Sequence, residues 1–486
     1  MDLTSKGDKR KESKLIVTVD PTLMPPPYLN PYLRLFIYIA YILTSGCIYW
    51  GWNGLQMILY KGGAFEDLCV GAEGVTKKII EGAEFIDCPA RAGGINNLYT
   101  LAYATHFICS FVGGRILDQF GPRVCFLVGH AFTATAWVMV FCLTKYGNVL
   151  RAAFVIIGLF CEACYIPLLS VSMYFPNGNS TVMAVMGSCR SLSYLIPSLL
   201  AWIYYIDGVE QSMIAVIGVC YVLLTNVVCF VSGAFIVPKV LPIAPSDAAI
   251  EDNKEAYSTV NLDDAVVESA TAKTTVLTNL KAAFKSKQLV EFIVLTCSAC
   301  FFMPSIEFVN KSQGNLLVAS GKGGDATHVF RYFNVLTFVP APFLGLFMDK
   351  VGPAIVMNIL HLCAVLYYVC VGFDIYAMKI AACCCFVMAG SLCVSTTYCY
   401  VNKRFPKQHF GTLVSIIFAF AGSAALTNIP IYNYGLTLTS AVPEQQFRPI
   451  SYLFLTYMCI AYVCSAYLVY LSNFRGKKPV TQQGES

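Results

Sequence analysis

A short polar segment occurs twice in this chain, each time between two long apolar runs. The first copy spans residues 114–123 and the second begins at residue 345, so the copies lie 231 positions apart. A repeat of this length predicts two similar halves, which is how many secondary transporters are built. Gly, Asp and Gly recur in register, at Gly114, Asp118 and Gly121 and again at Gly345, Asp349 and Gly352.

Two further matches support a duplication. Pro197 and Pro430 lie 233 positions apart, and the pair Phe175-Pro176 returns 230 positions later at residues 405–406. The offsets are close to that of the polar segment, and the matches come in the same order in both halves. The sequence therefore favours a duplicated fold.

The apolar runs indicate a membrane protein. The 486 residues are 57% hydrophobic and 13% charged, whereas soluble domains carry about 25% charged residues. Apolar runs of about 20 residues are long enough to cross a bilayer as helices. We predict an all-α membrane protein with twelve transmembrane helices in two six-helix bundles. The predicted order is a tail at 1–32, a bundle at 33–236, a linker at 237–288, a bundle at 289–472 and a tail at 473–486.

Basic residues predict which side each loop faces. Arg115, Arg123, Lys350, Lys403 and Arg404 fall in short segments on the side that also holds both termini. Cytosolic loops are enriched in Lys and Arg, so we expect both termini in the cytosol. We also expect a monomer in the lipid bilayer of the plasma membrane. The basic residues are scattered, which argues against nucleic-acid binding.

The first polar segment resembles a loop motif of the major facilitator superfamily, roughly Gly-x-x-x-Asp-Arg-x-Gly-Arg-Arg. Gly114, Asp118, Gly121 and Arg123 match it, and Gln119 departs from it. The resemblance implies a carrier with a central site that opens alternately to each side. It also implies that the Asp118 carboxylate contacts the positive N-terminus of a helix in the other half, near residue 411.

A narrower resemblance lies in the first two predicted helices and their loop. Residues 50–56, with the sequence WGWNGLQ, and the segment at 96–99 are similar to the amino-acid facilitators of solute carrier family 43 and their apicomplexan relatives. This resemblance implies a uniporter for large neutral, aromatic or cationic amino acids. A carrier of nucleobases or another small organic solute, and a non-transporting nutrient receptor on the same fold, remain alternatives.

The cysteines divide into two groups. Cys69 and Cys88 share the long loop that we expect to face an oxidising space, so they form a disulfide or remain as two thiols. Most of the others lie in apolar spans, including Cys161 and Cys164, where no histidine or carboxylate cluster completes a metal site. We expect no metal and no cofactor. No Ser, His and Asp are spaced for catalysis, so we expect a carrier and not an enzyme.

Two ionisable residues at membrane depth carry the functional hypothesis. Glu162 lies in the predicted fourth span and Arg190 in the fifth. They either form a structural pair, or Arg190 binds a substrate carboxylate, because guanidinium offers a charged two-pronged donor. His106 is either a packed or water-facing side chain or a substrate or proton contact. Three aromatic residues, Tyr49, Tyr194 and Tyr398, are expected to line the same cavity.

A second charged pair is expected nearer the outer face. Glu307 ends the predicted seventh span and Arg331 begins the eighth. These side chains either form an ion pair that helps to hold an outer gate or extend separately to the membrane surface. Because no acidic residue stands at mid-depth of the first span, we favour facilitated diffusion over proton coupling.

Overall fold

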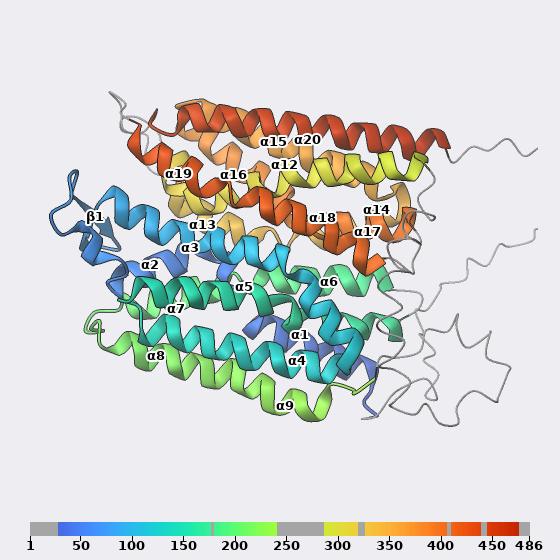
Figure 1. Cartoon of the computed structure of the whole chain (residues 1–486), viewed down its shortest axis with the longest axis horizontal. Helices are drawn as coiled ribbons and strands as arrows, with labels where there is room; N and C mark the ends of the chain where they lie inside the picture. Colours follow the sequence, from blue (N-terminus) through green and yellow to red (C-terminus); the bar gives the residue numbers. More distant parts are fainter. Residues whose placement is uncertain are drawn as a thin grey trace, which may run out of the picture.

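The computed structural model describes residues 28–175, 179–240, 286–318, 326–405, 410–438 and 445–475. The N-terminal half, coloured blue to green, and the C-terminal half, coloured yellow to red, lie side by side with their helices roughly parallel (Figure 1). The predicted tails apart from residues 28–32 and 473–475, and the linker apart from its first and last few residues, lie outside the described residues, as do Pro176 and Pro406.

The N-terminal half consists of helices and one two-stranded hairpin. Its elements are α1 (Pro31–Ser45), η2 (Ile48–Trp50), α2 (Trp52–Lys61), η3 (Glu66–Cys69), β1 (Thr76–Ile80), β2 (Ala83–Asp87), α3 (Pro89–Ile108), α4 (Ser110–Cys142), α5 (Gly147–Leu169), η4 (Ser170–Tyr174), α6 (Asn179–Leu192), α7 (Leu195–Tyr204), α8 (Met213–Val222), η5 (Leu223–Val227) and α9 (Val228–Ile236).

The described C-terminal half contains helices only. They are α12 (Ser286–Leu316), α13 (Thr327–Leu336), α14 (Pro340–Val351), α15 (Pro353–Gly372), α16 (Tyr376–Ser391), α17 (Ser395–Arg404), α18 (Phe410–Ala425), α19 (Asn428–Thr437) and α20 (Arg448–Arg475).

Every predicted span contains helix, but not every span is a continuous apolar helix. Among the described residues, eight helices are each long and apolar enough to cross a membrane, and the pair α13–α14, bent by 48°, makes a ninth. The predicted first and fifth spans are each broken into two shorter helices, and the second, α3, is rich in polar residues. These three spans carry most of the polar side chains of the candidate site.

The repeated polar segment has the same backbone geometry in both halves. Gly121 has φ 81° and ψ 171°, and Gly352 has φ 94° and ψ 157°. Side chains with a Cβ rarely adopt this region, so glycine is needed at both positions. Pro122 and Pro353 then begin the next helix, where the missing N–H has no intrahelical partner to lose. The structure thus confirms that the two segments are equivalent.

The repeated prolines also act alike. Pro197 is the third residue of α7 and Pro430 is the third residue of α19, and in both cases the helix before it has ended a few residues earlier. Proline fits the first turn of a helix but interrupts a continuous one. The fifth and eleventh predicted spans are therefore broken at equivalent places.

A further equivalence escaped the sequence analysis. His130 on α4 and His361 on α15 also lie 231 positions apart. Both are buried, both have Nδ1 near a backbone carbonyl oxygen, at 3.0 and 3.2 Å, and both pack against a phenylalanine ring. The histidine is therefore repeated in both halves, although these partners of His130 lie on its own helix and those of His361 on α12 and α20.

The loop before α3 forms an antiparallel hairpin, which the all-α prediction missed because its strands are short and carry charges. A disulfide joins Cys69 to Cys88 with an S–S distance of 2.00 Å, which confirms the predicted pair. Lys78 on β1 lies 4.3 Å from the centroid of the Tyr60 ring, and burial lowers the pKa of its ammonium group. We call this end of the molecule the hairpin end (Figure 1).

Hydrogen bonds between the two halves gather toward the hairpin end. Within the described residues, several of them connect α2 and α3 of one half with α12 and α19 of the other. Among them are Asn53–Gln313 at 2.8 Å, Asn96–Tyr432 at 2.7 Å, Asn97–Asn433 at 3.0 Å and Tyr103 to the Met303 carbonyl at 3.1 Å. The halves are therefore joined by polar contacts at this end.

Candidate functional site

A cluster of polar side chains lies inside the N-terminal half where its helices are interrupted. Arg190 stands near the end of α6, just before the break that separates α6 from α7. We define the Arg190 cluster as Arg190 with its neighbours from α1–η2, α3 and α5, namely Cys47, Tyr49, His106, Cys161 and Glu162. A helix break frees backbone and space for polar groups that a continuous apolar helix would exclude.

The charges of the cluster meet at the Glu162 carboxylate. Arg190 Nη2 donates to Glu162 Oε1 at 2.9 Å, and His106 Nε2 lies 2.5 Å from the same oxygen. The side chains of Glu162 and His106 are 4% and 1% exposed, whereas that of Arg190 is 12% exposed. The structure confirms that Glu162 and Arg190 meet, and it places the guanidinium on the more open side of the pair.

His106 belongs to this cluster and does not stand alone. Its Nδ1 lies 2.7 Å from the Tyr49 hydroxyl. A neutral imidazole that accepts a hydrogen bond from Tyr49 at Nδ1 carries its proton on Nε2, which faces Glu162. Tyr49, His106 and Glu162 then form one chain of hydrogen bonds that fixes the carboxylate next to Arg190.

Two thiols and an aromatic ring complete the surroundings of the guanidinium. Arg190 Nη2 lies 3.2 Å from Cys47 Sγ and 3.8 Å from Cys161 Sγ. The guanidinium carbon lies 4.4 Å from the centroid of the Tyr165 ring, which is a cation–π contact. Sequence reasoning missed Cys47 and Tyr165 because both read as ordinary apolar positions of a span.

The predicted aromatic residues lie nearby in different ways. Tyr49 is buried and contacts His106 directly, and Tyr194 stacks on Trp50 with ring centroids 5.7 Å apart. Tyr398 comes from the other half and packs edge-on against Phe418 at 5.2 Å. Tyr49 therefore belongs to the Arg190 cluster, Tyr194 packs beside it on Trp50, and Tyr398 packs within the C-terminal half.

A second buried polar cluster joins the two halves. We define the Glu307 cluster as Glu307 and Lys311 of α12, Thr100 of α3 and Asn428 of α19. The Thr100 hydroxyl donates to Glu307 Oε1 at 2.5 Å and accepts from Lys311 Nζ at 2.6 Å. Lys311 Nζ also donates to the Asn428 carbonyl oxygen at 2.9 Å, and the Asn428 amide donates to Glu307. Both charged side chains are fully buried.

The predicted pairing of Glu307 with Arg331 is wrong, and so is the surface placement of Glu307. Glu307 Oε1 lies 3.8 Å from Lys311 Nζ, one helical turn away on α12. Arg331 instead pairs with Glu81 at the tip of the hairpin, at 3.2 Å. The sequence prediction ended the seventh span near Glu307, although α12 runs on to Leu316 and buries Lys311.

The repeated polar segments lie at the opposite end from the hairpin. Gly345 allows α14 to approach α6, because an added Cβ would lie 2.9 Å from Ala184 Cβ, whereas nothing lies within 4 Å of the same position at Gly114. Asp349 lies 4.0 Å from Lys403, and Arg123 donates to the Val237 carbonyl oxygen at 2.8 Å. The role of Asp118 against the start of α18 remains a prediction.

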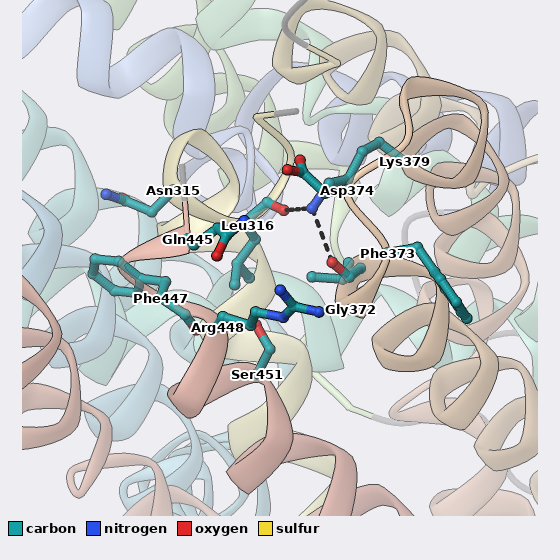
Figure 2. A pocket seen from close by; sticks show the side chains of 11 residues that line it. Asn315, Leu316, Gly372, Phe373, Asp374, Lys379, Gln445, Phe447, Arg448 and Ser451 are labelled. Carbon is teal, nitrogen blue, oxygen red and sulfur yellow. Dashed lines mark hydrogen bonds between the residues drawn. The ribbon is translucent and has the colours of Figure 1, made fainter. Parts of the chain in front are cut away.

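A pocket at the hairpin end of the C-terminal half is lined by the ends of α12, α15, α16 and α20 (Figure 2). Lys379 reaches into it and donates to the carbonyl oxygens of Leu316 at 2.8 Å and Val371 at 2.9 Å. Its volume is about 20 Å³, which holds about one water molecule. The pocket is therefore too small for an organic substrate.

Comparison with known proteins decides the family. The sequence profile of the Major Facilitator Superfamily matches residues 33–429, which is most of the chain and includes both repeated segments. This chain belongs to the Major Facilitator Superfamily. It is therefore a multi-pass membrane protein of a transporter family, and the predicted fold is confirmed.

The chain is also similar to amino acid transporters of apicomplexan parasites. It is 24% identical to "Arginine transporter 1" of Toxoplasma gondii, in a match covering 83% of this chain and 82% of the relative. It is 26% identical to "Aromatic and large neutral amino acid transporter 5-3" of Toxoplasma gondii, with 84% and 79% covered. It is 25% identical to "Cationic amino acid transporter 8" of Plasmodium berghei, with 84% and 83% covered.

Solved structures share the fold at low sequence identity. An auto-inhibited peptide transporter of the POT family has a TM-score of 0.58 at 11% identity, covering 93% of this chain and 99% of the other. A mutant of a nucleoside transporter has a TM-score of 0.56 at 11% identity, covering 90% and 100%. These likenesses establish the arrangement of the helices in the fold of this family.

Proposed function

We propose that this protein carries amino acids across a membrane by alternating access, and that Arg190 binds the substrate carboxylate. The observation that supports this role is the position of its guanidinium, which is held in a buried cluster, although the Arg190 side chain is more exposed than those of Glu162 and His106. Guanidinium matches a carboxylate with two parallel hydrogen bonds. The relatives named as amino acid transporters point to the same substrate class.

Glu162 is the counter-ion of Arg190 before the substrate binds. Glu162 keeps Arg190 paired until a substrate carboxylate exchanges for it, so the buried guanidinium is never left without an anion. Large neutral, aromatic or cationic amino acids are the substrates we propose, with Tyr49, Tyr194 and Tyr398 as aromatic walls for the side chain. Transport is uniport, since neither α1 nor α2, the two parts of the first span, contains an acidic residue.

The orientation follows from the hairpin. A disulfide is stable on the oxidising side of a membrane, so the hairpin end faces outward and both termini face the cytosol, and we propose the plasma membrane as the location. Opening of the Glu307 cluster then admits substrate from outside. Separation of α6 from α14 at the other end releases it.

Uptake into proteoliposomes tests the substrate class. Labelled amino acids, nucleobases and hexoses are offered one at a time to the purified full-length protein. We expect uptake of at least one amino acid, with exchange between internal and external pools and no dependence on a pH gradient. Uptake of nucleobases alone contradicts the proposed substrate class, and amino-acid binding without uptake would indicate a receptor.

Substitution of Arg190 tests its role. Arg190→Lys keeps the charge but loses the two parallel N–H donors of the guanidinium, and Arg190→Ala loses both the charge and the donors. The affinity for the substrate should therefore fall about ten- to a hundredfold in the alanine variant. Analogues with an amide in place of the carboxylate should bind the native protein poorly and lose little more in Arg190→Ala. Arg91→Lys is the matched control, because Arg91 is also buried but donates to the carbonyl oxygens of Ala64 and Tyr60.

A purely structural role for the pair predicts a different pattern. Glu162→Ala combined with Arg190→Ala removes both charges and should then restore the amount of folded protein. If that double variant also regains normal uptake with unchanged preference for the carboxylate, Arg190 does not bind the substrate.

A further inference from the structure

Two thiols and an imidazole converge inside the Arg190 cluster. Cys47, His106 and Cys161 each offer one ligand atom, and the three atoms lie within 4.8 Å of one another. All three residues are buried, and they come from the α1–η2 junction, α3 and α5. Among the described residues, this is the one group of at least three His, Cys, Asp or Glu side chains with such spacing. The transport mechanism uses His106 but gives the thiols no role.

The spacing fits a small tetrahedral cation site. Zinc binds thiolate sulfur at about 2.3 Å and imidazole nitrogen at about 2.0–2.1 Å, so neighbouring ligand atoms stand about 3.4–3.8 Å apart. The Cys47 and Cys161 sulfur atoms lie 3.3 Å apart and need to separate only slightly. A tetrahedral ion held by two thiolates and one imidazole keeps its fourth position for water or another ligand. We expected no histidine or carboxylate cluster to complete a metal site at Cys161, and the structure places His106 and a second thiol within reach of it.

Arg190 lies against all three ligands and against Glu162. Its Nη2 lies 3.2 Å from Cys47 Sγ, 3.2 Å from His106 Nε2, 3.8 Å from Cys161 Sγ and 2.9 Å from Glu162 Oε1. A metal ion at the same point would repel the guanidinium, so the two cations are alternatives. Arg190 has the most exposed side chain of the charged group and can withdraw toward the open side.

The exchange leaves the buried charge balanced. Thiols must lose their protons to bind a metal, so one divalent cation enters as two protons leave, two S–H bonds break and two metal–sulfur bonds form. His106 stays neutral, because its proton moves from Nε2, which then binds the metal, to Nδ1, which donates to the Tyr49 hydroxyl oxygen. The net charge of the cluster is unchanged, which matters because an added buried charge is costly.

We propose that Cys47, Cys161 and His106 form a binding site for a thiophilic divalent cation such as Zn²⁺ or Cd²⁺. Binding displaces Arg190 from Glu162 and stops transport. The second statement rests on the proposed function, because it requires that Arg190 bind the substrate. The first rests only on the arrangement of the three ligands.

Cadmium binding to the purified full-length protein tests the site. Cd²⁺ is titrated while the thiolate-to-cadmium absorption is followed and bound metal is counted. The native protein should bind one more Cd²⁺ than Cys47→Ser or Cys161→Ser. Cys125→Ser is the matched control, since Cys125 is buried in the same half but its thiol donates to the Gly113 carbonyl oxygen, at 3.3 Å. Equal stoichiometry in all four proteins overturns the site.

Uptake in the presence of Cd²⁺ tests the displacement of Arg190. Each variant is compared with its own uninhibited rate, and the inhibition constant should rise at least about tenfold in Cys47→Ser and Cys161→Ser but not in Cys125→Ser. Cadmium that binds at the predicted stoichiometry without slowing uptake overturns the displacement. If no amino acid is taken up yet the cadmium difference persists, the proposed function fails and the metal site stands.

Discussion

Thr100→Val is expected to shift the carrier toward the state that is open at the hairpin end. The Thr100 hydroxyl is the group of the N-terminal half that bonds directly to the buried charges of Glu307 and Lys311, at 2.5 and 2.6 Å. Valine has the same shape but forms neither bond. Each charged group would then lose one partner in the closed state, whereas water can replace that partner once the gate opens.

The size of the shift follows from these two bonds. A hydrogen bond to a charged group contributes about 1.5–3 kcal/mol, so losing even one changes the ratio of closed to open carrier about 10- to 100-fold. Folding of each half should be little affected, because the lost bonds connect the halves. The apparent KM for external substrate should fall, since more carrier is competent to bind, while the maximal rate falls because closure is harder.

Hydrogen–deuterium exchange in the purified protein measures the shift. Peptides from the hairpin-end parts of α2, α3, α12 and α19 should exchange faster in Thr100→Val than in the native protein. Thr105→Val is the matched control, because the Thr105 hydroxyl bonds within its own helix, to Leu101 at 2.8 Å and Ala102 at 3.1 Å. If Thr100→Val exchanges at the same rate as Thr105→Val and its uptake kinetics are unchanged, the Glu307 cluster does not act as a gate.

Three further outcomes are expected. Non-reducing peptide mapping should recover Cys69 and Cys88 as one linked pair, and free alkylation of both thiols would contradict the disulfide. Gly121→Ala and Gly352→Ala should each lower the melting temperature, because a side chain at a positive φ adds about 1–3 kcal/mol of backbone strain to the folded state. An unchanged melting temperature would mean that the turns can relax. Asp118→Asn should slow uptake and raise thiol accessibility from the cytosolic side at normal expression, and no change in either would argue against a clamp.

The repeat explains why so much of the fold could be predicted. Gly121 and Gly352 are visible in sequence because only glycine adopts their backbone conformation readily, and Pro197 and Pro430 are visible because proline interrupts helices. Such residues report local geometry directly. The hairpin was less visible, because its strands of five residues alternate charged and apolar side chains too briefly to stand out.

Partners in the site depend on distances between helices, which local patterns do not contain. Glu162 and Arg190 were matched because their spans are neighbours in the chain. Cys47 was not matched to Cys161, because 114 positions separate them and both resemble ordinary apolar residues of a membrane span. Lys311 was missed because its charge made the span appear to end early. Its partners Thr100 and Asn428 come from helices that are distant in the sequence.

The distribution of charges between the halves explains how the gate can open without a large barrier. Glu162 and Arg190 belong to the same half, and Glu307 and Lys311 to the same helix, so opening the interface separates neither buried pair. Among the described residues, the ion pair that crosses between the halves is Arg331–Glu81, whose side chains are 22% and 41% exposed.

Breaking a buried ion pair by removing one partner costs about 3–5 kcal/mol, whereas an exposed pair contributes about 0–1 kcal/mol. In the buried part of the interface, the N-terminal half contributes neutral side chains to the contacts between the halves, above all the Thr100 hydroxyl.

Thr100 and His106 lie six residues apart on α3, about 9 Å along the helix. Helix α3 packs so closely on α5 that a Cβ at Gly158 would collide with the Ala102 carbonyl oxygen. We therefore expect His106 on α3 and Glu162 on α5 to move together when the halves separate.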